Sequence, residues 1–152
     1  MSFARTLLRA AVPSTRIRSI RAMSATPYET VSTTNAPAAI GPYCQAVKHN
    51  GTIYASGSVP LNPETMKVVE GDINAHAEQM FKNVKGVMDA AGTDTSRVLK
   101  TTVFLASMDD FAAFNKHYAE FFAPYKPARS CVAVKTLPLN VLCEMEFIAV
   151  EK

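Results

Sequence analysis

Arg129 stands near the start of an apolar, strand-like run, Pro127–Val132, in a chain that has only one other arginine, Arg97, beyond residue 21. A guanidinium that enters such a strand requires an anionic partner, because burying it unpaired costs several kcal/mol. The sequence leaves two partners open. One is an internal salt bridge to Glu144 or Glu146 on an adjoining strand, and the other is a carboxylate or phosphate ligand held bidentately by the planar guanidinium.

Glu144 is the second residue that suggests chemistry, because it is an acid in a final strand otherwise suited to burial, and Glu146 shares its face. A carboxylate beside a desolvated pocket can act as a general base toward water, whereas the alternative is a strand residue that faces solvent. Three further polar residues are candidates by position: Tyr43 at a strand start, Ser56 at a strand end and Asn115 on a helix. Each of these three, taken alone, is more often structural than functional.

The three cysteines, Cys44, Cys131 and Cys143, do not indicate a disulfide framework, because their number is odd and an intracellular protein meets reducing conditions. The sequence has no C-x-x-C or H-x-x-x-H pair for zinc, and its three scattered histidines are expected at the surface or at caps. Nothing in the sequence requires a metal or an organic cofactor. Cys131 has no evident histidine base and is expected to line a pocket rather than to act as a nucleophile.

The elements that would position these residues begin with a β-hairpin. Asn50-Gly51 tolerates the positive φ values of a two-residue turn, so residues 43–48 should pair antiparallel with residues 52–58. Apolar residues then recur at helical spacing from Asp72, the expected N-cap, to Ala91, and Gly92 is expected to end this helix.

The second half of the chain predicts a buried strand over residues 98–106 and another helix. This helix is expected to start near Ser107, to have Asp110 in capping-box position and to end before Pro124. Its aromatic stripe is interpreted as core and consists of Phe111, Phe114, Tyr118, Phe121 and Phe122.

Two final strands are predicted over residues 129–135 and 141–150. With an earlier strand before the Pro- and Gly-rich loop at 35–42, the order is β-β-β-α-β-α-β-β, which favours a two-layer α+β domain. The side of the final strand that faces away from the helices stays partly apolar. This second apolar face suggests burial against another subunit.

Charge is distributed unevenly along the chain, whose formal net charge is +3. Five of the seven arginines lie in the first 21 residues, which contain no acidic residue: Arg5, Arg9, Arg16, Arg18 and Arg21. An Arg-rich, acid-free N-terminus with Ser and Thr is typical of a mitochondrial transit peptide, so we predict a leader over residues 1–24 and one domain over residues 25–152. The alternative is a basic tail that binds anionic surfaces without being cleaved.

The predicted domain itself is mildly acidic, with 11 basic residues against 13 acidic ones. It has two arginines and no tryptophan, and therefore lacks the basic, aromatic surface with which proteins follow phosphates and stack on bases. No stretch approaches the roughly 18 apolar residues needed to span a bilayer. A nucleic acid or a membrane is thus not the expected partner.

Several segments of this sequence together resemble the RidA (YjgF) family of imine/enamine deaminases. They are Asn35-Ala-Pro-Ala-Ala-Ile-Gly-Pro-Tyr43, Ala55-Ser-Gly57, Lys100-Thr-Thr-Val-Phe104, Pro127-Ala-Arg-Ser-Cys-Val132 and Glu144-Met-Glu-Phe-Ile-Ala-Val150. The resemblance covers residues 27–152, and with the Arg-rich leader the chain is similar to the mitochondrial, maintenance-factor branch of eukaryotic members. It implies a chorismate-mutase-like α+β protomer that assembles as a homotrimer with sites in the clefts between subunits.

The resemblance also implies roles for individual residues. Arg129 matches the family's carboxylate-binding arginine, Cys131 the neighbouring backbone contact, and Glu144 the glutamate that activates water. The remaining pocket positions fall on Tyr43, Ser56, Gly57 and Asn115. The sequence departs from the family pattern at Ser58, where many members carry Gln, and at Cys44, so pocket size and substrate range stay open.

The activity implied by the resemblance is hydrolysis of 2-aminoacrylate, 2-aminocrotonate and their imine tautomers to 2-oxo acids and ammonia, which protects pyridoxal-phosphate enzymes. Two alternatives stay open: a non-catalytic trimer that binds 2-oxo acids as a sensor or chaperone, and an RNA-acting translation inhibitor. The mitochondrial matrix is the expected location, with a cytoplasmic fraction of the chain as a second expectation.

Overall fold

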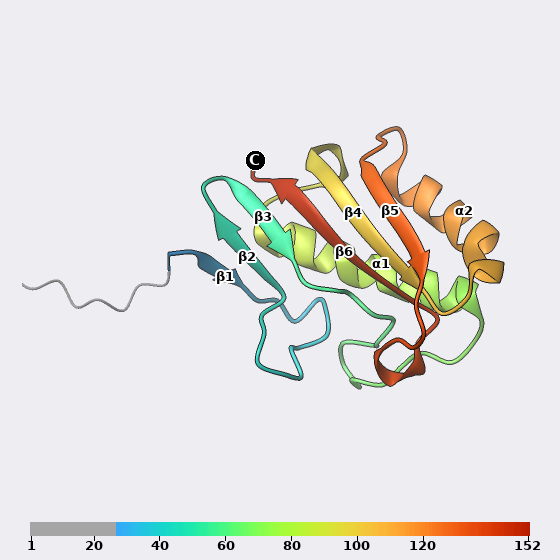
Figure 1. The fold of residues 1–152 in the computed structure, drawn as a ribbon. Coiled ribbons are helices and arrows are strands. Elements are labelled where there is room, and N and C mark those ends of the chain that lie inside the picture. The colour runs from blue at the N-terminus through green and yellow to red at the C-terminus, as the bar shows by residue number, and fades with distance from the viewer. Residues whose placement is uncertain (1–26) are drawn as a thin grey trace, which may run out of the picture.

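The computed structural model describes residues 27–152, so the leader predicted over residues 1–24 lies outside the described residues. Six strands form one mixed sheet in the order β1-β2-β3-β6-β4-β5, with α1 and α2 against the same face (Figure 1). The elements are β1 (Glu29–Val31), β2 (Ala46–His49), β3 (Thr52–Ala55), α1 (Ile73–Ala91), β4 (Val98–Leu105), α2 (Phe111–Phe122), β5 (Ala128–Ala133) and β6 (Cys143–Val150), with short 3-10 turns at Thr95–Arg97, Met108–Asp110 and Pro138–Asn140. The predicted two-layer α+β architecture and its element order are confirmed.

The predicted hairpin is confirmed, but its strands are shorter than expected. Asn50 and Gly51 form the turn with φ values of 51° and 74°. β3 also pairs with β6, and beyond β3 the chain stays beside β6, where Ser58 and Met145 exchange backbone hydrogen bonds of 2.8 and 3.1 Å. This path brings Gly57 against the side chain of Glu144.

The predicted limits of α1 are confirmed by its caps. The Asp72 carboxylate accepts hydrogen bonds from the backbone N–H groups of Asn74 and Ala75, and Gly92 ends the helix with a φ of 75°. The capping box predicted for the second helix is wrong. Ser107 and Asp109 instead bond each other and cap a 3-10 turn, so α2 begins only at Phe111 and Asp110 makes no side-chain cap bond.

The core lies between the helices and one face of the sheet. From β6 it takes the odd-numbered residues Cys143, Met145, Phe147 and Ala149, all at most 1% exposed. The aromatic stripe of α2 packs there as predicted, with Phe114 and Phe122 buried and Phe121 stacked on Phe81 of α1 at 4.7 Å. Within residues 27–152, no helix is long and apolar enough to cross a membrane.

The opposite, open face of the sheet carries apolar side chains, as the sequence predicts. Tyr54 of β3 and Val132 of β5 are 48% and 47% exposed, and Ile148 of β6 pairs laterally with Tyr54. Glu144 and Glu146 share this open face because they are an even number of residues from Ile148.

His76 of α1 is buried rather than at the surface or at a cap, contrary to the expectation for the histidines. Its Nδ1 accepts a 3.1 Å hydrogen bond from the Leu142 N–H, so its Nε2 carries the proton and donates to the Val69 carbonyl, also at 3.1 Å. The ring thereby joins α1 to the residue that immediately precedes β6.

Candidate active site

Arg129 of β5 lies on the helix-covered face of the sheet, partly buried against α2. Its Nη1 donates a 2.9 Å hydrogen bond to the Asn115 side-chain oxygen. The guanidinium carbon lies 4.3 Å from the centre of the Tyr118 ring and 5.6 Å from that of Phe111, which is cation–π geometry. Among residues 27–152, no ion pair involves Arg129. The internal salt bridge to Glu144 or Glu146 is therefore ruled out as the partner of this guanidinium.

The register of the sheet explains why that salt bridge does not form. Arg129 is level with Thr101 of β4, which is level with Phe147 of β6, so these three side chains point to the helix side. Glu144 precedes Phe147 by an odd number of residues and points to the other face, level with Phe104. Within one chain, Arg129 and Glu144 thus face opposite sides of the sheet.

The Tyr118 ring packs against one face of the Arg129 guanidinium, and its hydroxyl lies 2.9 Å from the buried Thr101 hydroxyl. Burial raises the pKa of Tyr118 and keeps the phenol neutral. Burial also raises the pKa of Cys131, which lies two residues along the same strand face, so its thiol stays protonated near neutral pH. A protonated thiol is a poor nucleophile, and Cys131 is not among the residues that line the cavity beside Arg129. We call Arg129, Asn115, Tyr118, Phe111 and Cys131 the arginine half-site.

The arginine half-site opens into a cavity of about 530 Å³ between α2, the following loop and β5. Asn115, Tyr118 and Arg129 line its inner wall, and Tyr125 and Lys126 of the loop line another part. A guanidinium with one N–H group held by an amide and its face held by a phenol ring is fixed in orientation. Its other N–H groups are the donors that a carboxylate requires.

Glu144 lies on the open face against the segment that follows β3. A Cβ placed on Gly57 would overlap the Glu144 carboxylate, so only a glycine leaves room for this side chain. Burial raises the pKa of Glu144, and the negative charge of Glu146 raises it further. A raised pKa makes the carboxylate a better proton acceptor at neutral pH.

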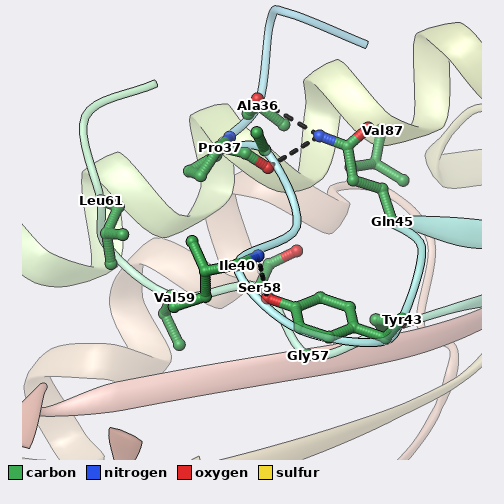
Figure 2. A pocket seen from close by; sticks show the side chains of 12 residues that line it. Ala36, Pro37, Ile40, Tyr43, Gln45, Gly57, Ser58, Val59, Leu61 and Val87 are labelled. Atoms are coloured by element: carbon green, nitrogen blue, oxygen red, sulfur yellow. Dashed lines mark hydrogen bonds between the residues drawn. The ribbon is translucent and has the colours of Figure 1, made fainter. Parts of the chain in front are cut away.

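Tyr43 and Ser56 lie near Gly57 around a second cavity (Figure 2). The Ser56 hydroxyl donates a 2.7 Å hydrogen bond to the Cys44 carbonyl, and the Tyr43 hydroxyl accepts a long, 3.4 Å bond from the Ile40 N–H. We call Glu144, Gly57, Ser56 and Tyr43 the glutamate half-site. The residues predicted from the sequence thus form two groups rather than one.

Tyr118 was expected only as part of the core, although it also supports Arg129. The available signal was its hydroxyl, since it is the one hydroxyl-bearing residue in the aromatic stripe. Among the residues that the structure describes, no group of three or more His, Cys, Asp or Glu side chains could hold a metal ion.

The part of the chain that is similar to known proteins includes the residues of both half-sites. The family model for Endoribonuclease L-PSP matches residues 33–151. "Protein MMF1, mitochondrial" of Saccharomyces cerevisiae is 50% identical over 122 residues, which are 80% of this chain and 83% of that protein. The 2-iminobutanoate/2-iminopropanoate deaminase of Salmonella typhimurium is 45% identical over 127 residues, which are 82% of this chain and 98% of the enzyme. The crystal structure of yeast Mmf1 has a TM-score of 0.80 and 49% identity, and the match covers 82% of this chain and 99% of that one.

Proposed function

Since the chain belongs to the endoribonuclease L-PSP family, which includes the RidA proteins, we propose that it is a deaminase of 2-imino acids. Its substrates are 2-aminoacrylate, 2-aminocrotonate and their imine tautomers, 2-iminopropanoate and 2-iminobutanoate. The observation that carries this proposal is the guanidinium of Arg129, oriented by Asn115 and Tyr118 and without an ion-pair partner among residues 27–152. Such a group is an anion site, and the substrate carboxylate is the anion it fits.

A complete site combines the arginine half-site of one copy with the glutamate half-site of another. Arg129 and Glu144 point to opposite faces of one sheet, so a single chain does not bring them to the same substrate. The open face carries exposed Tyr54 and Val132, which a second copy would cover. We infer a homotrimer, the assembly that the resemblance to the family implies, with one site in each cleft between subunits. In such a closed ring of identical heterologous contacts, every half-site has a partner.

The reaction needs only water as a second reactant. Arg129 holds the carboxylate and fixes the imine carbon beside a water molecule. Glu144 accepts a proton from the water as the water oxygen bonds to the imine carbon, and the C=N nitrogen takes up a proton from solvent to give an amino alcohol. Glu144 then returns its proton to the nitrogen, and the C–N bond breaks as the hydroxyl group loses its proton to solvent and becomes the carbonyl of the product. The products are ammonia and a 2-oxo acid, pyruvate or 2-oxobutanoate.

Removing these imines and enamines would protect pyridoxal-phosphate enzymes, which release them from serine and threonine. The mitochondrial matrix is the location that we propose. The five arginines among the first 21 residues and the mitochondrial relative support it.

A coupled assay tests the proposed activity. A serine dehydratase generates 2-aminoacrylate, the chain without residues 1–24 is added, and the release of ammonia and pyruvate is timed against the uncatalysed reaction. Faster release in proportion to the protein concentration supports the deaminase. Saturable binding of 2-oxo acids with no acceleration would contradict it and favour a non-catalytic sensor.

A further inference from the structure

The cavity beside Arg129 has two charged residues in its lining, and both are cations. They are Arg129 itself and Lys126 of the loop between α2 and β5, and of the described residues no Asp or Glu contributes to the lining. Among residues 27–152, neither cation forms an ion pair with an acidic side chain. The described part of the chain therefore leaves the positive charge of this cavity uncompensated.

This local charge is opposite in sign to the charge of the whole domain. Residues 25–152 include 11 basic and 13 acidic residues, which gives a formal net charge of −2. At long range such a domain repels a carboxylate, and a local positive potential is needed to attract one to its binding site. The cavity beside Arg129 supplies this potential where the substrate carboxylate binds.

The two cations differ in how they act on an anion. Asn115 and Tyr118 fix the Arg129 guanidinium, so Arg129 can hold a carboxylate in one orientation. Lys126 is exposed, and its ammonium group is a compact charge on a flexible four-carbon stem. Such a group attracts a carboxylate without fixing its orientation, so the attraction depends on charge and distance alone.

Lys126 precedes Arg129 by three residues, so their Cα atoms are at most about 11 Å apart. This separation is similar to the Debye length, which is about 10 Å at 0.1 M ionic strength. The charge of Lys126 therefore acts on an anion at Arg129 in dilute salt and is screened in concentrated salt. We propose that Lys126 is an electrostatic steering residue, which attracts the substrate carboxylate into the cavity where Arg129 holds it. The proposal rests on carboxylate binding at Arg129, which is part of the proposed function.

Two charge substitutions test this role: Lys126→Gln removes the charge, and Lys126→Glu reverses it. Lys67→Glu is the matched control, because Lys67 is also an exposed lysine without an ion pair among residues 27–152. Its segment lies at the end of the sheet where β5 ends, whereas Lys126 precedes the start of β5 (Figure 1). All variants are made in the full chain. Calorimetry measures the Kd of 2-oxobutanoate, a stable carboxylate product, at about 0.01 M and about 0.5 M ionic strength, and the coupled assay measures kcat/KM at both.

The expected result is a loss of affinity that depends on salt. For charges about 10 Å apart in water, Lys126→Gln should raise Kd about twofold and Lys126→Glu about fourfold in dilute salt, and neither should change it in concentrated salt. kcat/KM should fall by the same factors, and Lys67→Glu should keep wild-type values.

Two results would overturn the steering role: a Kd of Lys126→Glu equal to that of Lys67→Glu in dilute salt, or a loss in Lys126→Gln that persists in concentrated salt. If the wild type binds 2-oxobutanoate with the expected salt dependence but does not accelerate imine hydrolysis, the deaminase function fails and the steering of carboxylates stands. A wild type that binds no 2-oxobutanoate contradicts both.

Discussion

Replacing Gly57 by Ala tests the role of Glu144 without changing Glu144 itself. An added Cβ would overlap the carboxylate and lie 2.8 Å from Cδ and 3.1 Å from Cγ of Glu144, whereas carbon atoms in contact prefer about 3.5–4.0 Å. The φ of Gly57 is not in the left-handed region, so Ala adds this collision without backbone strain. The Glu144 carboxylate must therefore move away from the position it occupies in the wild type.

The expected loss follows from what a general base contributes. A positioned base accelerates proton transfer about 100- to 10,000-fold, so kcat of Gly57→Ala should fall by a factor in that range. KM should change little, because the carboxylate of the substrate is held by Arg129 on the other half-site. Steady-state kinetics on 2-aminoacrylate, generated by a dehydratase, measures both constants.

A double-mutant cycle identifies the cause of the loss. In the Glu144→Ala background there is no carboxylate for the new methyl group to displace, so Gly57→Ala should have little further effect. An equal loss in both backgrounds would show that Gly57→Ala acts independently of Glu144. Wild-type kcat in the single variant would refute the reasoning directly.

Three further changes have distinct expected outcomes. Arg129→Lys loses the bidentate guanidinium and with it one charge-assisted hydrogen bond to the substrate carboxylate, worth about 1.5–3 kcal/mol. Saturation kinetics should therefore show a roughly 10- to 150-fold rise in KM. An unchanged KM would show that Arg129 does not bind the carboxylate. Burial raises the pKa of Glu144 in the folded state, so the stability of the fold falls as the pH rises from the pKa of Glu144 in the unfolded chain through its pKa in the folded protein. Glu144→Gln should lose this part of the pH dependence of the thermal unfolding temperature. An unaltered pH dependence in this variant would contradict the raised pKa. His76→Leu leaves the Leu142 N–H and the Val69 carbonyl unpaired at about 1–3 kcal/mol each, so urea unfolding should show a free energy of unfolding lower by about 2–6 kcal/mol. The side chain of His76→Gln can both accept and donate a hydrogen bond and should recover much of this loss. Equal losses in the two variants would contradict the bridging role of His76.

The elements that could be predicted from the sequence are those whose signals are local. Asp72 and Gly92 lie at the ends of α1, and Asn50-Gly51 sets its own turn, because a cap or a two-residue turn depends on the residues that form it. A local signal failed at Ser107. There the neighbouring Asp109 competed for the same hydroxyl and produced a 3-10 turn instead of a capping box.

The position of His76 in the sequence indicates its burial. It lies between Ile73 and Ala77 on the apolar stripe of α1, where a polar residue is either a break in the stripe or a buried hydrogen-bonding group. Asn83 follows the same rule, between Met80 and Val84. The Leu142 N–H that bonds to His76 and the Val59 and Leu61 carbonyls that accept from Asn83 are at least 22 residues away in sequence, and a helical pattern does not identify such partners.

The division of the candidate site could not be predicted from local patterns. Arg129 and Glu144 belong to different strands, β5 and β6, and the alternation within a strand says which residues share a face but not which face it is. The answer depends on the registers of β5 and β6 with β4, and those pairings join residues that are far apart in sequence. This is why the sequence was compatible with a salt bridge between Arg129 and Glu144, although no such salt bridge forms within residues 27–152.

Subunit mixing tests most directly the central claim, that a site joins Arg129 of one chain to Glu144 of another. Arg129→Ala and Glu144→Gln trimers, each inactive alone, are unfolded together in equal amounts and refolded, and mass spectrometry confirms mixed trimers. A site is complete only where an intact arginine half-site meets an intact glutamate half-site, which random assembly gives at about one site in four. The account predicts about a quarter of wild-type activity. Background activity in confirmed mixed trimers would contradict it, since a site contained within one chain is not restored by mixing.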